Sequence, residues 1–399
     1  MVQRIDKLIT GRPRLQRLRD SWLLRRFNWR GTATFVAGNR ATLLPHGGDF
    51  FPSLLAAMAR AQRQITLEYY IIRGDALGIR FAEAALDAVK RGVAVYLIYD
   101  YVGCFDTPAA YFQRLEQGGV RLICFNRPRF GRVFGWIDKR NHRKIAIVDA
   151  QLAFLGGLNI GDEYSGYGES PDRWRDCGMH LNGPVVQELQ SLFWESWRDE
   201  GGEVPAAALQ SLPDAAGGDG VLVVSGGPNH RRSLIKRSYQ LAITHAERRL
   251  AIVTPYFLPG PRLVRMMLKA TRRGVKVTLL LPGESDVPLL KIVSHPYLNL
   301  LLKAGVEVYE RGGTVLHAKL MQVDDLWTLI GSANFDQRSF YRNYETNLIV
   351  ESREFSREVE QMLKEDLARS MRLTVDRHRQ RRWYESLLEW LLSPLKRFL

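Results

Sequence analysis

The chain has 399 residues, of which 46% are apolar, so it can form two domains of ordinary size and is not globally disordered. Its net charge of +15 favours a polyanionic partner: nucleic acid, an anionic membrane or a phosphate-bearing substrate. Three dispersed cysteines, Cys104, Cys124 and Cys177, argue against a disulfide framework or a thiolate zinc site and fit a reducing compartment.

The N-terminal segment, residues 1–38, is basic and amphipathic, with arginines among Leu, Trp and Phe. Such a mixture is typical of a helix among lipid headgroups, but it would equally suit a helix docked on the protein's own core. The segment lacks the apolar centre of a signal peptide, and no apolar run reaches the roughly 18 residues that a membrane span needs. We therefore expect a soluble or peripheral protein.

Two similar stretches, residues 65–100 and 250–286, indicate an internal repeat. Each reads as an apolar strand, a helix-periodic segment, Arg-Gly-Val and a second apolar strand. Strand, helix, strand is the unit of a parallel sheet, and a glycine after a basic last turn ends a helix. The similarity of the two copies continues in YFQRLEQGGV, which begins at Tyr111, and YLNLLLKAGV, which begins at Tyr297.

A stretch rich in Gly, Pro and Ala at residues 201–220 separates the two copies and predicts a linker. We expect a first domain at residues 39–200 and a second at 221–375, followed by a basic aromatic tail at 376–399 that resembles the N-terminal segment in character. The predicted fold class is α/β, with two domains related by a pseudo-twofold axis so that equivalent segments meet across it.

One motif occurs once in each half with the same spacing: His-x-Lys, four residues, Asp, six residues, then a Gly-Gly or Gly-Ser pair, one residue and Asn. Two matches at equivalent places in a duplicated chain are difficult to attribute to chance. The members are His142, Lys144, Asp149, Gly157 and Asn159 in the first half, and His317, Lys319, Asp324, Ser332 and Asn334 in the second.

The spacing has a geometric meaning. His and Lys, two residues apart, project from the same face of a strand, whereas Asp at an odd spacing cannot share that face. The apolar runs on either side of Asp149 predict two strands with a turn between them, which brings Asn159 back beside His142. The same folding brings Asn334 beside His317, and the glycines allow a close backbone approach to a bound group.

Two such half-sites that face each other would form a phosphate pocket. The lysines supply positive charge and the asparagines supply donors, and both stabilise the added negative charge of a pentacoordinate phosphorus. One imidazole can attack phosphorus while the other protonates the leaving oxygen. No dense carboxylate cluster suggests a metal cage, so we expect neither a metal nor another cofactor.

The doubled motif resembles that of the phospholipase D superfamily, over roughly residues 40–375. The resemblance implies two phospholipase D-like α/β/α sandwich domains with the active site at their interface. It also implies a metal-independent, ping-pong transfer through a phosphohistidine, with His142 as our predicted nucleophile. The catalytic residues carried over are His142, Lys144, Asp149, His317, Lys319 and Asp324.

The resemblance extends to carboxylates, because family members orient each histidine with one downstream of the motif. Glu345, 28 residues after His317, and Asp176, 34 residues after His142, resemble these positions. Glu68 resembles a site-lining residue of the first strand, although it could equally be a surface carboxylate at a strand end. The predicted substrate-binding residues are thus Asn159, Asn334, Glu345, Asp176, Glu68, Gly157 and Ser332.

Stretches such as NHRKIAIVDAQLAFLGGLNIGDEY and NYETNLIV resemble cardiolipin synthases, especially the shorter B type with a basic aromatic tail. The resemblance implies phosphatidyl transfer between two phosphatidylglycerols, which gives cardiolipin and glycerol. It also implies a peripheral protein on the cytoplasmic side of the bacterial inner membrane. Its partners would be phosphatidylglycerol and an anionic membrane surface, with nucleic acid unlikely and no obligate protein partner.

Two rival functions stay open. The first is a phosphodiesterase that hydrolyses phospholipid or single-stranded nucleic acid on the same scaffold. The second is an inactive lipid-binding module, which both complete half-sites disfavour. An insertion at residues 126–141, rich in arginine and aromatic residues, would suit a lipid headgroup, single-stranded nucleic acid or a solvated loop. The phosphatidyl donor, phosphatidylglycerol or phosphatidylethanolamine, also stays open.

Overall fold

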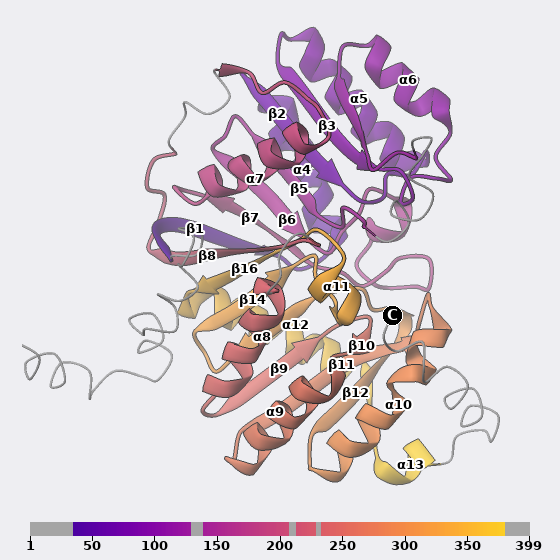
Figure 1. Ribbon diagram of the computed structural model, residues 1–399, viewed down its shortest axis with the longest axis vertical. Coiled ribbons are helices and arrows are strands. Elements are labelled where there is room, and N and C mark those ends of the chain that lie inside the picture. The colour runs from indigo at the N-terminus through magenta and orange to yellow at the C-terminus, as the bar shows by residue number, and fades with distance from the viewer. Residues whose placement is uncertain (1–34, 129–138, 207–212, 229–232, 380–399) are drawn as a thin grey trace, which may run out of the picture.

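The computed structural model describes residues 35–128, 139–206, 213–228 and 233–379. Two α/β halves lie end to end along the longest axis, the first in indigo to magenta and the second in orange to yellow (Figure 1). A single 15-stranded sheet runs through both halves. The predicted α/β class and the two halves of the repeat are therefore confirmed.

The first half contributes seven strands in the order β1-β7-β6-β5-β2-β3-β4. Their bounds are β1 (Val36–Leu44), β2 (Gln64–Tyr69), β3 (Ala94–Asp100), β4 (Arg121–Phe125), β5 (Lys144–Val148), β6 (Leu152–Gly156) and β7 (Gly178–Asn182). The helices are α4 (Gly47–Arg60), α5 (Ala76–Lys90), α6 (Ala109–Gln117) and α7 (Val186–Asp199), with one 3-10 turn, η2 (Asp162–Tyr164).

The second half repeats this order as β8-β16-β14-β13-β9-β11-β12 and adds β17 at its edge. The bounds are β8 (Asp219–Gly226), β9 (Arg249–Val253), β11 (Lys276–Glu284), β12 (Glu307–Val315), β13 (Leu320–Val323), β14 (Trp327–Gly331), β16 (Glu345–Glu351) and β17 (Ser370–Leu373). A separate short pair consists of β10 (Phe257–Leu258) and β15 (Phe335–Asp336). The helices are α8 (Leu234–His245), α9 (Gly260–Arg272), α10 (Pro288–Lys303), α11 (Gln337–Tyr341), α12 (Arg353–Ala368) and α13 (Val375–Arg379).

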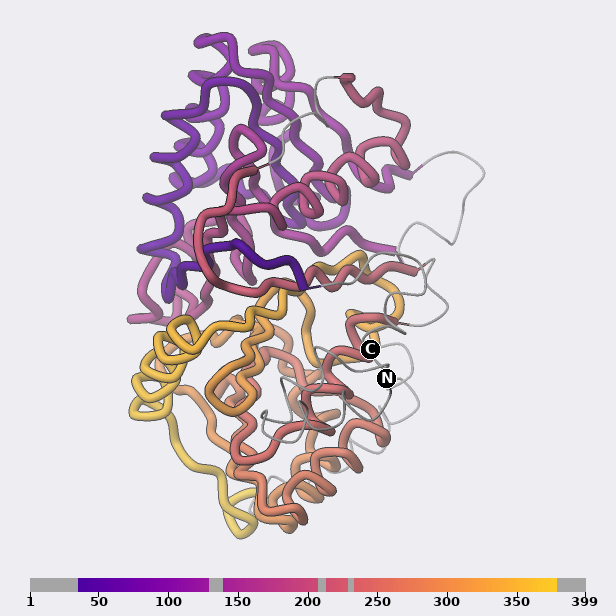
Figure 2. Tube along the Cα trace, turned by 90° about the vertical axis from the view of Figure 1, so that its left-hand side faces the viewer, coloured from indigo at the N-terminus to yellow at the C-terminus, as the bar shows by residue number. Residues whose placement is uncertain are grey.

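The repeat read from the sequence is present as β2–α5–β3 and β9–α9–β11, each with parallel strands. Apolar residues three or four positions apart form one face of α9, and this face is buried against the sheet. Its members include Leu263, Val264, Met267 and Ala270. Helices α4 and α5 lie on one side of the molecule, and their equivalents α8 and α9 lie on the opposite side (Figures 1 and 2). The two equivalent helical layers therefore face in opposite directions.

The two halves are joined at the antiparallel pair of β1 and β8, which are equivalent strands. One apolar cluster crosses this junction and includes Leu43 and Leu181 from the first half and Val221 and Leu348 from the second. Burial of such a shared core stabilises the relative placement of the halves. Segments that precede β5 and β13 are consequently held at the junction.

Several predicted segments can be placed only in part. Strand β1 begins at Val36, and β8 begins at Asp219, inside the segment 201–220 that we expected to be a linker. Residues 1–34 and 380–399, which contain most of the two predicted membrane-associating ends, lie outside the described residues. Within the described part of the chain, no helix combines the length and apolar character required to cross a bilayer.

The hairpins β5–β6 and β13–β14 turn at Asp149 and Asp324, each with a φ of 53°. Asp149 accepts hydrogen bonds from three successive backbone amides, those of residues 62–64, at 2.7–3.0 Å. Asp324 does the same with the amides of residues 247–249, at 2.8–3.2 Å. Each carboxylate therefore ties its hairpin to the start of the neighbouring strand.

We predict that Asp324→Ala lowers the free energy of unfolding by about 2 kcal/mol, because three amides lose a charged acceptor. Asp324 is buried, whereas the adjacent Asp325 forms only surface ion pairs with Arg248 and Arg353. Asp325→Ala is the matched control and should cost less than about 1 kcal/mol. Urea unfolding measures both, and equal losses would contradict a role specific to Asp324.

Candidate active site

The two motif histidines lie at the junction of the halves, and each is hydrogen-bonded through its backbone to the other half. The amide of His142 donates to the carbonyl of Tyr344 at 2.9 Å, and the amide of His317 donates to the carbonyl of Arg175 at 2.8 Å. Isolated parallel bridges join Asn141 to Tyr344 and Arg175 to Leu316. The segment before each histidine is thus paired with the segment before the opposite carboxylate.

Each imidazole contacts a carboxylate from the opposite half. His142 Nδ1 lies 3.0 Å from Glu345 Oε2, and His317 Nδ1 lies 2.7 Å from Asp176 Oδ2. The sequence suggested that these carboxylates orient the histidines, but it associated each with the histidine of its own half. The structure shows the pairing to be crossed, so each half-site depends on both halves.

The equivalent motif positions 157 and 332 hold different residues, Gly157 and Ser332. Each lies against one of the two carboxylates that contact the histidines. Ser332 Oγ donates to Glu345 Oε2 at 2.5 Å, and Asn343 Nδ2 donates to Glu345 Oε1 at 3.3 Å. A Cβ atom at Gly157 would lie 2.3 Å from Asp176 Oδ1, so any side chain there would displace the carboxylate. The two positions therefore help to fix the carboxylates that hold the rings.

The two motif lysines are almost completely buried beside their histidines. Lys144 Nζ donates to the backbone carbonyl of His142 at 2.7 Å and lies 5.3 Å from the centre of the Tyr70 ring. Lys319 Nζ donates to the carbonyl of His317 and also lies 2.7 Å from His317 Nδ1. Burial lowers the pKa of Lys144 to about 7 and that of Lys319 to about 8. An anionic substrate would favour the charged form of both.

Burial lowers the pKa of both histidines below the usual value, although Glu345 acts in the opposite direction on His142. Burial also raises the pKa of Asp176 to about 6. Both imidazoles are therefore neutral near pH 7. Because Nδ1 of each ring faces a carboxylate, Nε2 is the nitrogen left to react with a substrate.

Aromatic rings that the sequence analysis did not assign surround the histidines. The ring centre of Tyr70 lies 4.8 Å from that of His142, and those of Tyr164 and Trp174 lie 5.3 and 5.5 Å from that of His317. Tyr70 sits two residues after Glu68 and Trp174 two residues before Asp176. Strand alternation does not identify them, because β2 ends at Tyr69 and β7 begins only at Gly178.

The side chains of the two motif asparagines differ in their hydrogen bonds. Asn159 Oδ1 accepts from the amide of Ile71 at 3.2 Å, and its Nδ2 donates to Tyr164 Oη at 2.9 Å. Asn334 Oδ1 is buried, and no described residue donates to it. Asn159 therefore positions the Tyr164 ring beside His317, whereas the side chain of Asn334 is not engaged in this way.

Other predicted site residues lie away from the imidazoles. Glu68 is fully buried, and its Oε1 accepts from Asn141 Nδ2 at 2.6 Å and from Ser196 Oγ at 2.8 Å. It therefore contacts the residue before His142 and no motif histidine. Asp149 and Asp324 lie at the far ends of β5 and β13, so the structure does not bring them together with the histidines.

The insertion before His142 is anchored beside the site, although residues 129–138 lie outside the described residues. Arg140 Nη1 donates to Asp100 Oδ1 at 3.0 Å, and the amide of Asn141 donates to Asp100 Oδ2 at 2.9 Å. Arg140 is buried, so this arginine is a structural anchor at the base of the insertion. Asp100 and Glu68 together hold Asn141, the residue before His142.

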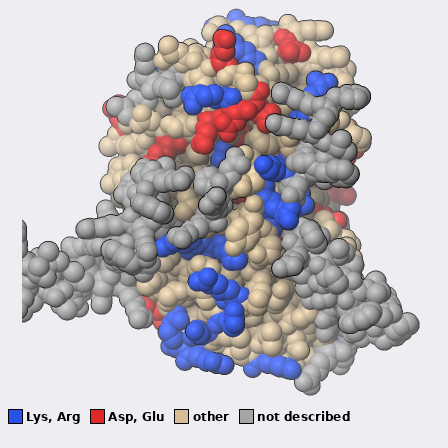
Figure 3. All heavy atoms as spheres, viewed as in Figure 1, with Lys and Arg blue, Asp and Glu red and all other residues tan. Residues whose placement is uncertain are grey.

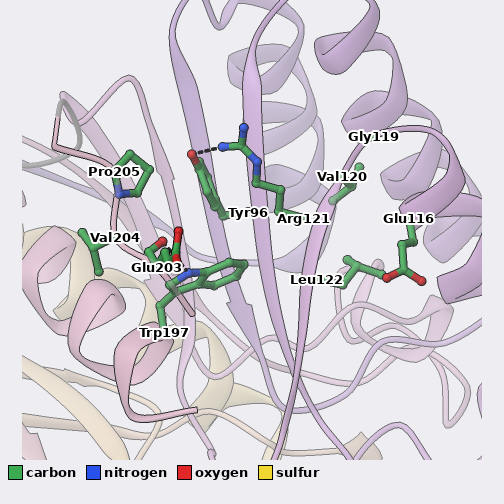
Figure 4. Close-up of a pocket in the computed structure, with 10 residues that line it drawn as sticks. All are labelled: Tyr96, Glu116, Gly119, Val120, Arg121, Leu122, Trp197, Glu203, Val204 and Pro205. Carbon is green, nitrogen blue, oxygen red and sulfur yellow. Dashed lines mark hydrogen bonds between the residues drawn. The ribbon is translucent and has the colours of Figure 1, made fainter. Parts of the chain in front are cut away.

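Neither a metal cluster among the described residues nor the cavity in the first half accounts for the site. Among the described residues, no group of three His, Cys, Asp or Glu side chains is arranged to hold a metal ion. A cavity of about 800 Å³ lies between β3, β4 and the end of α7, where Tyr96, Arg121 and Trp197 line it (Figure 4). None of the ten lining residues belongs to the doubled motif.

Comparison with known proteins gives the family. The model of the cardiolipin synthase, phospholipase D-like domain matches residues 54–197 and 240–367. The chain belongs to this family. It is 37% identical to cardiolipin synthase 2 of Bacillus anthracis over 88% of this chain and 70% of the relative. It is also 35% identical to cardiolipin synthase A of Pseudomonas syringae pv. syringae over 92% and 77% of the two chains.

A solved structure supports the fold independently. The crystal structure of phosphatidylserine synthase from Haemophilus influenzae superposes with a TM-score of 0.68 and covers 94% of this chain and 99% of that one. The two sequences are only 15% identical, so the likeness shows the fold alone. The arrangement of the whole chain is thus shared with that structure.

We predict that Glu345→Gln lowers the pKa of His142 and leaves that of His317 unchanged, because the carboxylate lost belongs to His142 alone. Titration of ¹⁵N-labelled imidazoles by NMR measures both values. Asp176→Asn is the reciprocal variant and should change the environment of His317. A shift at His317 in the Glu345→Gln variant would contradict the crossed pairing.

Proposed function

We propose that this protein is a cardiolipin synthase that transfers a phosphatidyl group from one phosphatidylglycerol to another at the bacterial membrane. The products are cardiolipin and glycerol. The observation that carries this proposal is the pair of neutral imidazoles, each backed by a carboxylate of the opposite half and flanked by a buried lysine. The named relatives supply the substrate class.

The contacts of Nδ1 support His142 as the nucleophile. Glu345 already accepts from Ser332 and Asn343, and a carboxylate can only accept, so His142 Nδ1 donates to it and Nε2 carries a free lone pair. His317 Nδ1 lies between a carboxylate and the Lys319 ammonium, so it can also accept and leave the proton on Nε2. In that tautomer His317 is suited to donate to a leaving oxygen.

The first step is attack of His142 Nε2 on phosphorus. The bond from phosphorus to the glycerol headgroup oxygen breaks, and that oxygen takes the Nε2 proton of His317 and leaves as glycerol, while His317 Nδ1 takes a proton from the adjacent Lys319 ammonium and the ring stays neutral. In the second step, a hydroxyl of another phosphatidylglycerol gives its proton to His317 Nε2 and attacks phosphorus, and His317 Nδ1 returns its proton to Lys319. The bond to His142 breaks and cardiolipin is released, so protons and bonds balance over the cycle.

Lys144 and Lys319 stabilise the negative charge that develops on the phosphoryl oxygens in both steps. Because these side chains supply the positive charge, we expect the reaction to need no metal ion. We place the protein peripherally on the cytoplasmic side of the inner membrane, and we retain the short B-type subclass and the terminal membrane-associating segments as part of the proposal. Their composition supports it.

We predict that purified protein converts detergent-dispersed phosphatidylglycerol to cardiolipin and glycerol in the presence of EDTA, with products identified by mass spectrometry. His142→Ala and His317→Ala should each lower kcat by at least about 1,000-fold, because both act in one pocket. Two independent sites would instead leave about half of the activity.

Other products would identify a different function. Phosphatidic acid as the main product would replace the transferase with a hydrolase. Cleavage of single-stranded DNA without any turnover of phospholipid would contradict the lipid substrate. Cardiolipin from a mixture with phosphatidylethanolamine, with release of ethanolamine, would change the donor and leave the transfer mechanism intact.

We predict a bell-shaped pH dependence of kcat/KM. Above pH 7 to 8, Lys144 and Lys319 lose their protons, so phosphate binding weakens and KM rises. Below about pH 6, Asp176 is protonated and no longer stabilises the proton that His317 Nδ1 takes up as Nε2 releases its own, so kcat falls. Steady-state kinetics from pH 5 to 9 measure both limbs, and a maximum at pH 9 would contradict these assignments.

A further inference from the structure

The helices that cover the second half differ sharply in charge from their equivalents in the first half. Helices α8, α9 and α10 together carry eight Lys and Arg and no Asp or Glu. The equivalent α4, α5 and α6 carry four basic and four acidic residues. Because both layers cover the same kind of sheet, packing alone does not require this charge.

The difference is concentrated on the exposed face of α9. Arg262, Arg265, Lys269 and Arg272 are all exposed and are spaced three or four residues apart, so they form one row along the helix. No Asp or Glu among the described residues lies within ion-pair distance of any of the four. Lys and Arg gather over this part of the second half, where Figure 1 places α9 (Figure 3).

The first half provides an internal comparison. The residues of α5 at the same four positions are Arg80, Glu83, Asp87 and Lys90, which carry no net charge. Three of the four are also partnered, since Lys90 lies 2.9 Å from Asp87 and Arg114 of α6 lies 3.9 Å from Glu83. The same helix face is therefore neutral in one copy of the repeat and uniformly basic in the other.

Helix stability does not account for the whole row. Like charges three or four residues apart destabilise a helix by about 0.2–0.5 kcal/mol per pair. The helix dipole favours Lys269 and Arg272 in the last turn of α9 but opposes Arg262 in the first turn. A row of like charges that lacks acidic partners in the described structure points to an external anionic partner.

We propose that the exposed face of α9 docks the protein on the anionic surface of a phospholipid bilayer; the proposal rests on the function given above. The neighbouring α10 supplies apolar side chains for the same surface, because Leu289 is 38% and Leu300 is 51% exposed. Position 114, which is equivalent to Leu300, is an arginine in α6. A face that combines a basic row with exposed leucines suits the headgroup layer of a membrane.

The surface is connected to the active site. Helix α9 begins directly after β10, and β10 pairs with β15, which follows Asn334. Gln337 Nε2 donates to the carbonyl of Pro259 at 2.9 Å and so fixes the start of α9 against that segment. Docking through α9 therefore sets the orientation of the second half-site relative to the membrane plane.

The test compares two variants with the same change in net charge. In the α9 variant Arg262, Arg265, Lys269 and Arg272 are each changed to Gln, and in the control Arg60, Arg80, Lys90 and Arg114 are each changed to Gln. Sedimentation with vesicles of equal phosphatidylglycerol and phosphatidylcholine measures the partition coefficient. Each basic residue near an anionic surface contributes about 1 kcal/mol, so the α9 variant should bind at least about 100-fold more weakly. The control should change less than about threefold.

Three further measurements test the proposal: turnover in detergent, thermal stability and binding of single-stranded DNA. The α9 variant should keep its turnover on phosphatidylglycerol dispersed in a neutral detergent, and its thermal stability should equal or exceed that of the unmodified protein. Unchanged vesicle binding, or an equal loss in the control, would overturn the docking surface. Loss of single-stranded DNA binding with vesicle binding retained would assign the row to nucleic acid and overturn it as well.

Failure of the docking surface and failure of the enzymatic function are distinguishable. If the unmodified protein binds vesicles through α9 but forms no cardiolipin, the docking surface stands and the proposed reaction fails. If cardiolipin forms but the α9 variant partitions normally, the reaction stands and the surface fails. His142→Ala, which should bind vesicles normally without turnover, separates the two readouts.

Discussion

The exchange of carboxylates across the pseudo-twofold axis is the interaction on which the rest of the site depends. Glu345 of the second half holds His142, and Asp176 of the first half holds His317. Neither half has an oriented imidazole without the other. The β1–β8 pair and the shared apolar core are therefore requirements of the chemistry, because a small shift between the halves would misplace both rings at once.

The sequence predicted the repeat, the motif residues and the two carboxylates, because these depend on spacing and on residue type. It could not predict the crossed pairing, because the partner of Glu345 depends on how the segment before β16 meets the segment before β5, 203 residues away. The odd spacing correctly separated Asp149 from the His–Lys face. The amides that Asp149 holds lie more than 80 residues upstream, which local periodicity cannot reveal.

A duplicated motif can perform two different tasks because the surroundings of its two copies differ. Glu345 is held by a serine hydroxyl, whereas Asp176 approaches a glycine that leaves room for it. Lys319 reaches the ring nitrogen of its histidine, whereas Lys144 reaches only the backbone carbonyl and lies near the ring of Tyr70. These differences favour different tautomers, and a nucleophile and an acid must differ in just that respect.

The two halves also differ in the charge of their outer helices. Helices α4–α6 and α8–α10 lie on opposite sides of the molecule, and a flat bilayer can meet only one of them. Two equally basic layers would compete for the membrane in two orientations. Neutral charge on α5 and a basic row on α9 allow one orientation only. A net charge of +15 contains no such information, because orientation depends on where the charge lies in the fold.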